Sequence, residues 1–396
     1  MSDRHPDDAT RPPLDGVLVA DLSRVLSGPL ATQVLGDLGA DVVKVEHPDG
    51  GDETRAWGPP WRRTDDGTRE STYHLAVNRN KRSVTLDLTE DHDLTLARRL
   101  CERADVVIEN FRPGVAARLG LSYEELAATN PGVIYASISG FGTARQARAL
   151  GGYDVLVQAV SGLMSVTGDE DGPPRKVGVA IVDVVAALYA SNGILAALYE
   201  RERSGRGQRL EVSLLGSALA ALVNQTSATL NAGVVPGRLG NAHPSVAPYE
   251  VLATADAPLA VAIGSERLFG RLVDALGVPE LADDPRFATN GDRVTNRPAL
   301  VALLEERLAT RGAAEWTEHL RGLGLPVGPV NDVEEAIAEA AALGLAPVVE
   351  VPRSDGETIA TVRSPLALSR TPTRYRHAPP RLGEHDAEVR RWLATE

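Results

Sequence analysis

The first half of the chain alternates short apolar runs with stretches of helical periodicity. Residues 16–22 and 41–46 are predicted strands, and the segment between them is predicted to be a helix from Ser27 to Leu38 that ends at Gly39. Further strands are predicted at 83–88, 105–109 and 133–137, with a helix over 91–104. This alternation predicts an α/β fold of the doubly wound, Rossmann-like type, with ligands bound at the carboxyl ends of parallel strands. The turn after the first strand lacks G-x-G-x-x-G, which argues against a dinucleotide-dependent redox enzyme.

The pattern changes after an apolar helix that runs to about Leu230. Two predicted strands are then followed by three predicted helices, at 249–254, 258–263, 266–276, 297–309 and 313–323. We therefore expect a smaller inserted α+β domain at 225–328. Residues 1–224 would form the first part of the large domain, and 329–396 a return segment that completes it.

A single carboxylate, Asp183, stands where a glycine-bearing segment meets the long apolar run 184–199. This predicts a loop at the start of a helix, beside the positive end of the helix dipole. We expect Asp183 to stay ionised, because amide donors and the dipole lower the pKa of a carboxyl group. An ionised carboxylate that faces a cavity is a nucleophile for an activated acyl group. The alternative is that Asp183 only caps the helix.

Composition narrows the class of protein. A chain of 396 residues is too long to fold around one small core, and its net charge of −13 argues against a nucleic-acid partner. The one cysteine, Cys101, falls in a helical pattern and indicates a packing residue in a reducing cytoplasm, and no metal site is expected. The amino terminus lacks a signal sequence, and Ser191, Asn192 and Gly193 interrupt the longest apolar run, so no membrane association is expected.

Motifs spread over about residues 13 to 390 together resemble the family III CoA-transferases, also called the CaiB/BaiF superfamily, of the formyl-CoA and carnitine CoA-transferase type. Each motif alone is weak, but their order and spacing are specific. They include Leu38-Gly-Ala-Asp-Val-Val-Lys-Val-Glu46, Asn78-Arg-Asn-Lys-Arg-Ser83, Ala104-Asp-Val-Val-Ile-Glu-Asn-Phe-Arg-Pro-Gly114, Gly152-Tyr-Asp154, the segment ending at Asp183, and Gly240-Asn-Ala-His-Pro244.

The resemblance implies a mechanism for Asp183. In this family the matching aspartate attacks the donor thioester, which gives a mixed anhydride and then an aspartyl-CoA thioester, and the acceptor acid follows the same route in reverse. Coenzyme A would be a substrate and product, and no permanently bound cofactor is implied. The partners would be acyl-CoA and carboxylic acids. An intertwined homodimer is expected from the family alone.

The resemblance also implies a CoA pocket. Arg82, Arg112 and Arg118 are candidates for the phosphates, because guanidinium groups bind phosphate oxygens in pairs. Six residues fall where family members line the adenine end of the pocket: Val25, His47, Leu86, Asn110, Phe111 and Arg118. Each arginine could equally be a surface charge, and Val25 or Leu86 a core residue.

Some positions depart from the formyl-CoA transferase pattern. Leu26 replaces a glutamine near the active site, and Thr89 and Gly151 replace lysines at the CoA site. These changes make formate and oxalate improbable substrates and leave room for a larger or less charged acyl group. His243, in the predicted small domain, is a candidate for the substrate pocket or a structural loop residue.

Two other functions are alternatives to CoA transfer. A 2-methylacyl-CoA racemase of the same superfamily would need a second base where this chain has Tyr153. A tyrosine, with an ordinary pKa of about 10, is a poor base at neutral pH. Asp154, beside it, is a candidate for orienting Asp183 or a helix cap. A non-catalytic CoA-binding protein is the further alternative, although it would be expected to have lost the aspartate.

Overall fold

A computed structural model describes residues 11–64 and 67–395. The chain divides into two compact units, which are described separately. The first comprises residues 1–163, 176–233 and 346–396, and the second comprises 164–175 and 234–345. The sequence pattern placed the smaller domain at 225–328, so the second unit begins and ends later along the chain and takes in one additional short segment.

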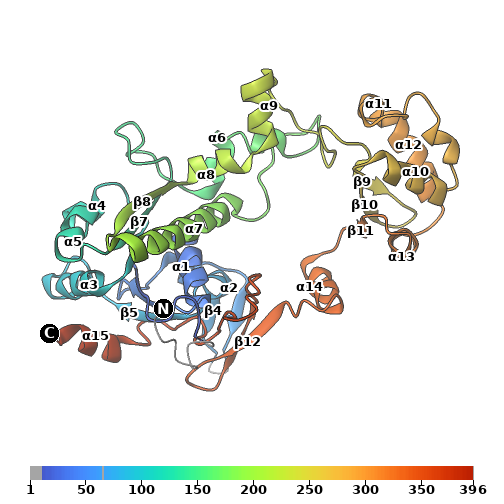
Figure 1. The fold of residues 1–396 in the computed structure, drawn as a ribbon. Coiled ribbons are helices and arrows are strands. Elements are labelled where there is room, and N and C mark those ends of the chain that lie inside the picture. The colour runs from blue at the N-terminus through green and yellow to red at the C-terminus, as the bar shows by residue number, and fades with distance from the viewer. Residues whose placement is uncertain (1–10, 65–66, 396) are drawn as a thin grey trace. The chain divides into compact units, whose positions relative to one another are not determined.

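The first unit is built on a six-stranded sheet in which every neighbouring pair of strands is parallel (Figure 1). The four central strands are buried along most of their length, so they appear in the sequence as nearly continuous apolar runs. In spatial order they are β5 (Lys81–Thr85), β2 (Asp41–Glu46), β1 (Leu18–Asp21), β6 (Val106–Glu109), β7 (Ile134–Ser139) and β8 (Gln208–Ser213). The strand order reverses between β1 and β6, and such a switch point is where doubly wound sheets bind ligands.

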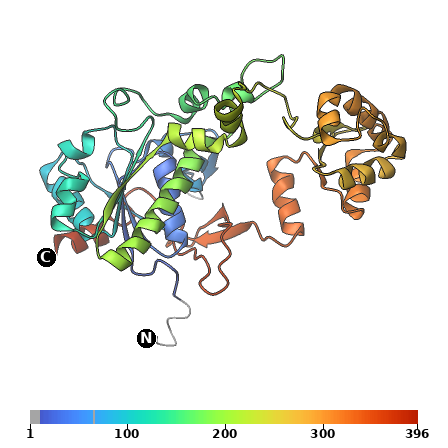
Figure 2. The same ribbon diagram turned by 45° about the horizontal axis from the view of Figure 1, so that its top comes forward.

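Helices cover both faces of this sheet. On one face α1 (Ser27–Asp37) lies beside α7 (Ile181–Ser204), and their Ala, Leu and Ile side chains form a buried core with the strands (Figure 2). The other face packs against α3 (Asp91–Arg103), α5 (Tyr123–Thr129) and the carboxyl-terminal α15 (Asp386–Ala394). A mixed α/β fold with a parallel central sheet is therefore confirmed.

Smaller elements of the first unit surround this sheet. They are η2 (Glu53–Ala56), β3 (Trp61–Arg63), β4 (Arg69–Ser71), α2 (Thr72–Ala76), α4 (Val115–Arg118), α6 (Asp154–Val160), α8 (Leu214–Ala221), α9 (Asn224–Ala232), β12 (Val348–Pro352) and β13 (Thr358–Val362). The apolar helix predicted to reach Leu230 is divided into α8 and α9 at Val223, whose φ is 39°.

The second unit has its own apolar core beneath a three-stranded antiparallel sheet. Its elements are η3 (Met164–Val166), β9 (Tyr249–Ala253), β10 (Pro258–Ala262), α10 (Glu266–Ala275), η4 (Pro279–Ala282), α11 (Asn290–Thr295), α12 (Arg297–Leu308), α13 (Ala313–Gly322), β11 (Val327–Pro329) and α14 (Val333–Ala342). The sequence pattern assigned α14 to the return segment. It groups with this unit because Glu339 on α14 binds Arg321 and Asn331.

By length and composition α7 could cross a membrane, with a mean hydropathy of 1.8 over an 18-residue window. The expectation that Ser191, Asn192 and Gly193 would exclude such a helix was wrong, because the flanking residues are apolar enough to compensate. Nine residues of α7, among them Ala186, Ala190 and Ile194, are buried against the sheet and its helices. A core helix of a globular protein has the same composition.

Candidate active site

A cavity of about 390 Å³ opens at the carboxyl ends of β1, β6 and β7, beside the switch point of the sheet. Its wall is formed by the segments that follow these strands and by the start of α7. The lining includes Arg24, Val25, Ser27, Asn110, Phe111, Arg112, Ser139, Gly140, Gly151, Tyr153 and Asp183. The predicted candidates Val25, Asn110, Phe111, Arg112, Tyr153 and Asp183 therefore lie in one cavity.

Asp183 is the third residue of α7, inside its first turn and not before it. The Asp154 carboxylate, at the start of α6, accepts hydrogen bonds from the amides of Val182 (2.9 Å) and Asp183 (3.4 Å). It also accepts a bond from the Gln158 side chain, whose oxygen in turn accepts the Val177 amide. Asp154 thus connects α6 to the helix start that carries Asp183.

The prediction that Asp183 has a lowered pKa was wrong. Burial raises its pKa, the nearby Asp154 carboxylate raises it further, and a hydrogen bond with the Ser27 side chain lowers it, giving a value of about 7. The amide donors expected to stabilise Asp183 as an anion bind Asp154 instead. A carboxylate of this basicity is a stronger nucleophile than an ordinary aspartate and is still ionised in a large fraction at neutral pH.

A second cavity of about 280 Å³ lies next to the first, and Arg24 and Phe111 line both. His47, Leu86 and Arg118, all expected at the adenine end of a CoA pocket, line this second cavity. His47 is half-exposed, with its Nε2 3.7 Å from the Asp87 carboxylate. Two of the three positions that depart from the formyl-CoA transferase pattern line these cavities: Thr89 lines the second and Gly151 the first.

The other candidates lie elsewhere. Arg82 lines neither cavity; its guanidinium binds the carboxylates of Asp41 and Glu388. Leu26 is buried at the start of α1 and is also absent from both linings. His243 belongs to the second unit, where its ring is tilted by 55° to that of Tyr249, with 5.2 Å between the ring centroids, and its Nδ1 accepts the Ser245 amide.

Asn110 has a role that sequence reasoning missed. Its side-chain oxygen accepts the Arg24 amide at 2.9 Å, and its side-chain nitrogen donates to the Arg24 carbonyl at 2.7 Å. Asn110 therefore holds the turn after β1 from the direction of β6. Only the three-dimensional neighbourhood of the two switch-point strands reveals this contact.

Ser27 and Tyr73 were also missed. Ser27 is buried, lines the first cavity and bonds to Asp183. Burial together with the charges of Asp183, Asp154 and Asp52 raises the pKa of Tyr73 to about 12, so Tyr73 stays protonated near the carboxylates. Neither residue carries a signal in the sequence, because a serine before Gly-Pro and a tyrosine in a short helix are common.

Among the described residues, no group of three His, Cys, Asp or Glu side chains is arranged to hold a metal ion. Cys101 is buried in the core under α3, where burial raises the pKa of its thiol to about 12. Such a thiol is unreactive at neutral pH.

Residues 14–386 match the family described as CoA-transferase family III. The succinate–glutarate CoA-transferase of Agrobacterium fabrum is 44% identical over 386 residues, which cover 97% of this chain and 96% of that protein. The mouse succinyl-CoA:glutarate CoA-transferase is 38% identical over 95% of this chain and 85% of its own length. A CaiB/BaiF family protein from Brucella suis, solved by crystallography, has 42% identity and a TM-score of 0.86, covering 97% of this chain and 100% of that one.

The matches extend over nearly the whole chain and include both the strands that form the cavity and the helix that carries Asp183. They confirm the resemblance inferred from the motifs and the assignment as a CoA-transferase. The chain belongs to CoA-transferase family III.

Proposed function

We propose that this protein moves CoA from an acyl-CoA donor to a carboxylic acid through covalent intermediates on Asp183. The observation that carries the proposal is a single buried carboxylate, with its pKa raised to about 7, in the wall of a cavity at the switch point of the sheet. Its basicity suits attack on a thioester, whose thiolate is a good leaving group.

The exchange has four balanced steps. An Asp183 oxygen attacks the thioester carbonyl carbon, the C–S bond breaks, and CoA thiolate leaves behind a mixed anhydride. The thiolate then attacks the side-chain carbonyl carbon of Asp183, and the donor acid departs as a carboxylate. An acceptor carboxylate attacks the resulting aspartyl-CoA thioester and again releases thiolate. The thiolate finally takes the acceptor acyl group and restores the Asp183 carboxylate.

The cavity wall supports these steps without ATP or metal. One thioester is exchanged for another of similar energy, so only the barriers need to be lowered. The glycine segments 140–142 and 151–152 bring backbone to the cavity wall, where amide groups can stabilise the oxyanions of tetrahedral intermediates. Ser27 can donate to Asp183 in its anionic form and so stabilises the state that must be regenerated.

For the CoA moiety, we propose that the pantetheine arm occupies the cavity at Asp183 and that the nucleotide end reaches the adjoining cavity. Phe111, shared by both linings, offers an aromatic face, and Arg118 a guanidinium for phosphate. Arg82 is left out of this proposal, because Asp41 and Glu388 already hold its guanidinium.

We propose short dicarboxylic acids as donor and acceptor. Relatives from Agrobacterium fabrum and mouse are named for succinate or succinyl-CoA and glutarate. Two positively charged residues, Arg24 and Arg112, line the first cavity, and the Arg24 guanidinium lies 3.7 Å from the carboxylate of Glu53, which also lines it. A distal carboxylate would need such a charge, because burying it unpaired is costly.

A donor and acceptor matrix read by mass spectrometry tests this function. Succinyl-CoA is the first donor, and the acceptors are paired acids of equal length with one or two carboxylates. We expect turnover to favour the dicarboxylic member of each pair, and this preference to shrink in Arg24→Gln or Arg112→Gln. Equal use of both members of every pair would contradict the dicarboxylate assignment but not CoA transfer.

The two alternative functions predict different reactions with acyl-CoA. The named relatives are transferases, which supports transfer over racemisation. A racemase would exchange the α-hydrogen of a 2-methylacyl-CoA with deuterated water and form no covalent adduct. A non-catalytic protein would bind acyl-CoA without either reaction.

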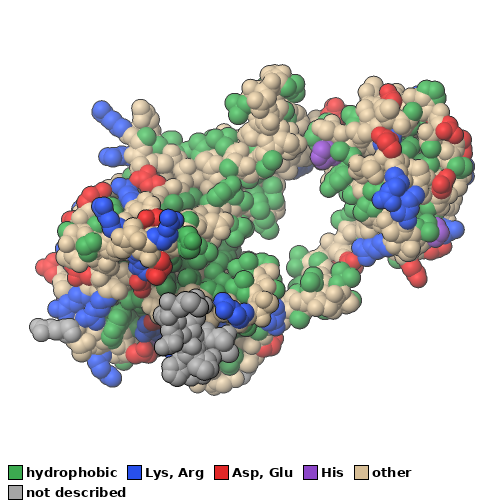
Figure 3. All heavy atoms as spheres, in the orientation of Figure 1, with side chains coloured by type: hydrophobic (Ala, Val, Ile, Leu, Met, Phe, Trp, Pro, Cys, Tyr) green, Lys and Arg blue, Asp and Glu red, His purple; other side chains and the backbone are tan. Residues whose placement is uncertain are grey.

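We also propose a homodimer. Large apolar side chains are exposed along α7, α8 and α9, and apolar atoms gather on this face in Figure 3. They include Leu188, Tyr189, Tyr199, Leu219 and Leu230, the last 82% exposed. Monomers rarely expose so much contiguous apolar surface. Light scattering coupled to size-exclusion chromatography should give twice the chain mass of 42.0 kDa, and a monomer mass would contradict the proposal.

A further inference from the structure

The turn between β1 and α1 contains a strained residue at the wall of the catalytic cavity. Val25 has a φ of +71°, in the left-handed region that β-branched residues rarely adopt. Such a conformation costs about 1–3 kcal/mol and persists only where the surroundings hold it. Val25 and Ser27 line the cavity, so the strain is stored next to Asp183.

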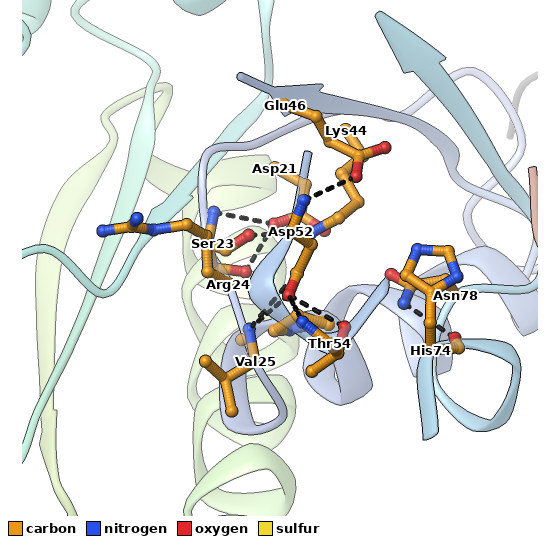
Figure 4. Close-up of polar contacts among 12 residues, drawn as sticks. Asp21, Ser23, Arg24, Val25, Lys44, Glu46, Asp52, Thr54, His74 and Asn78 are labelled. Atoms are coloured by element: carbon orange, nitrogen blue, oxygen red, sulfur yellow. Dashed lines mark hydrogen bonds and ion pairs between the residues drawn. The ribbon is translucent and has the colours of Figure 1, made fainter. Parts of the chain in front are cut away.

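A buried ion pair holds this turn (Figure 4). The two Asp52 carboxylate oxygens accept the Val25 amide at 3.3 and 3.2 Å, and one of them also accepts the amide and hydroxyl of Thr54. Lys44 pairs with Asp52 at 2.9 Å and donates to the Ser23 carbonyl at 2.8 Å. One ion pair therefore holds the turn at Ser23 and at the amide of the strained residue itself.

A second ion pair supports the same turn. Asp21 accepts the amide and hydroxyl of Ser23 and pairs with Lys81 at 3.0 Å. The Ser23 side chain lies where a side chain on residue 28 would be, since a Cβ built on Gly28 would come within 2.2 Å of it. All four charged side chains, Asp21, Lys44, Asp52 and Lys81, are fully buried, and together they carry no net charge.

Burial of these charges is not explained by stability. Removing a carboxylate and an ammonium group from water costs several kcal/mol for each ion, and apolar residues of similar volume often give equal or greater stability. The side chains of Asp52 and Lys44 contact the turn directly, since Asp52 accepts the Val25 amide and Lys44 donates to the Ser23 carbonyl. Burial would raise the pKa of Asp52, but Lys44 and the Thr54 amide lower it to about 2, so the pair remains charged at neutral pH.

We propose that the Lys44–Asp52 ion pair is a positioning device of the active site: it holds Val25 in the left-handed conformation and thereby sets Ser27 against Asp183. Asn110 fixes the preceding residue, Arg24, by its two backbone hydrogen bonds. The inference rests on the proposed function, since the group being positioned is the nucleophile. Lys44 and Asp52 are positioning residues toward Asp183, because neither lines the cavity at Asp183; Asp52 also lines the adjoining cavity.

The test exploits the freedom of glycine at positive φ. Asp52→Asn keeps the size of the side chain but removes its charge, and we expect kcat/KM to fall about tenfold, the low end of the strain released. Adding Val25→Gly should restore most of the loss, because glycine adopts this conformation without support. Val25→Ala is the matched control: it removes the two γ-methyl groups but keeps the Cβ, so it should not restore activity.

A second variant covers the case in which Asp52→Asn does not fold. The double variant Lys44→Met/Asp52→Leu removes both charges together. It should fold but lose activity, and the addition of Val25→Gly, but not of Val25→Ala, should restore that activity. The proposal is overturned if Asp52→Asn or the double variant keeps the kcat/KM of wild type. It is also overturned if Val25→Gly and Val25→Ala restore activity equally.

A readout without turnover separates this proposal from the proposed function. The carboxyl ¹³C shift of Asp183 reports its titration, which the facing groups Ser27, Asp154 and Tyr73 influence. Loss of the Ser27 contact should move the Asp183 titration upward in Asp52→Asn and in the double variant Lys44→Met/Asp52→Leu, and Val25→Gly should move it back. An unchanged titration would overturn the positioning role even if transfer occurs. If the parent protein transfers no CoA but its titration responds as expected, only the proposed function fails.

Discussion

Replacing Asp183 by asparagine should stabilise the protein, and increasingly so as the pH rises. Asparagine has the same shape and can still accept a hydrogen bond from Ser27. The pKa of Asp183 rises from an ordinary 3.8 to about 7 on folding, through burial and the Asp154 charge. The folded state therefore binds this proton more tightly than the unfolded state, which is the reverse of the usual aspartate.

The sign and size follow from this shift. The stabilising contribution of protonated Asp183 is fully present below the unfolded pKa of 3.8 and is lost as the pH rises to the folded value of about 7. A shift of roughly three units at about 1.4 kcal/mol each corresponds to about 4 kcal/mol over the full range. Between pH 5 and 8, wild type should lose about 3 kcal/mol relative to Asp183→Asn.

Urea unfolding followed by tryptophan fluorescence measures this difference. The two proteins are compared at each pH from 5 to 8, so that titrations they share cancel. We expect the free energy of unfolding of Asp183→Asn to exceed that of wild type by an amount that grows with pH and levels off above 7. A difference that stays constant from pH 5 to 8 would refute the assigned environment of Asp183.

Neighbouring side chains should move the pH dependence of transfer in opposite directions, measured as kcat/KM from pH 5 to 9. In wild type the rate should rise with an apparent pKa near 7, because ionised Asp183 is the nucleophile. Asp154→Asn removes a negative charge and should shift the profile to lower pH, whereas Ser27→Ala removes a hydrogen bond to the anion and should shift it to higher pH; shifts of the same sign would count against this arrangement. Arg118→Ala should raise KM for acyl-CoA about tenfold with little change in kcat, while Arg82→Ala, outside both cavities, should leave KM unchanged. Equal effects of the two arginines would remove Arg118 from the CoA site.

Much of the fold could be predicted because parallel strands and core helices have strong local patterns. Asp41–Glu46 is a strand over its full predicted length, and the helix predicted at 91–104 spans Asp91–Arg103. Short elements with little apolar periodicity were missed, such as α2 and α4. The division between α8 and α9 at Val223 was also missed, since its backbone conformation has no sequence signal there.

The sequence indicated which residues line the candidate site, but it did not predict the pKa of Asp183. The motifs selected Asp183, Asn110 and Phe111, which line one cavity in the structure, although Asn110 and Phe111 were expected at the adenine end of the CoA pocket. The pKa of Asp183 was misjudged because it depends on burial and on Asp154, which takes the helix amides; sequence spacing contains neither quantity.

The sequence reasoning also did not predict the buried charges beneath the turn after β1. Lys44 and Lys81 lie in motifs that identify the family, yet nothing in their spacing predicts that both ammonium groups are fully buried under the turn after β1. The Lys81–Asp21 pair joins segments 60 residues apart, so it depends on the order of strands in the sheet.

Covalent capture of CoA on Asp183 tests the central claim most directly. The protein is incubated with succinyl-CoA in the absence of an acceptor acid, digested at acidic pH, and analysed by peptide mass spectrometry. The account predicts a CoA-sized mass increase on the peptide that contains Asp183, its disappearance when an acceptor acid is added, and no adduct in Asp183→Asn. An active wild-type enzyme that never carries CoA on this peptide, or an Asp183→Asn variant that retains turnover, would contradict it.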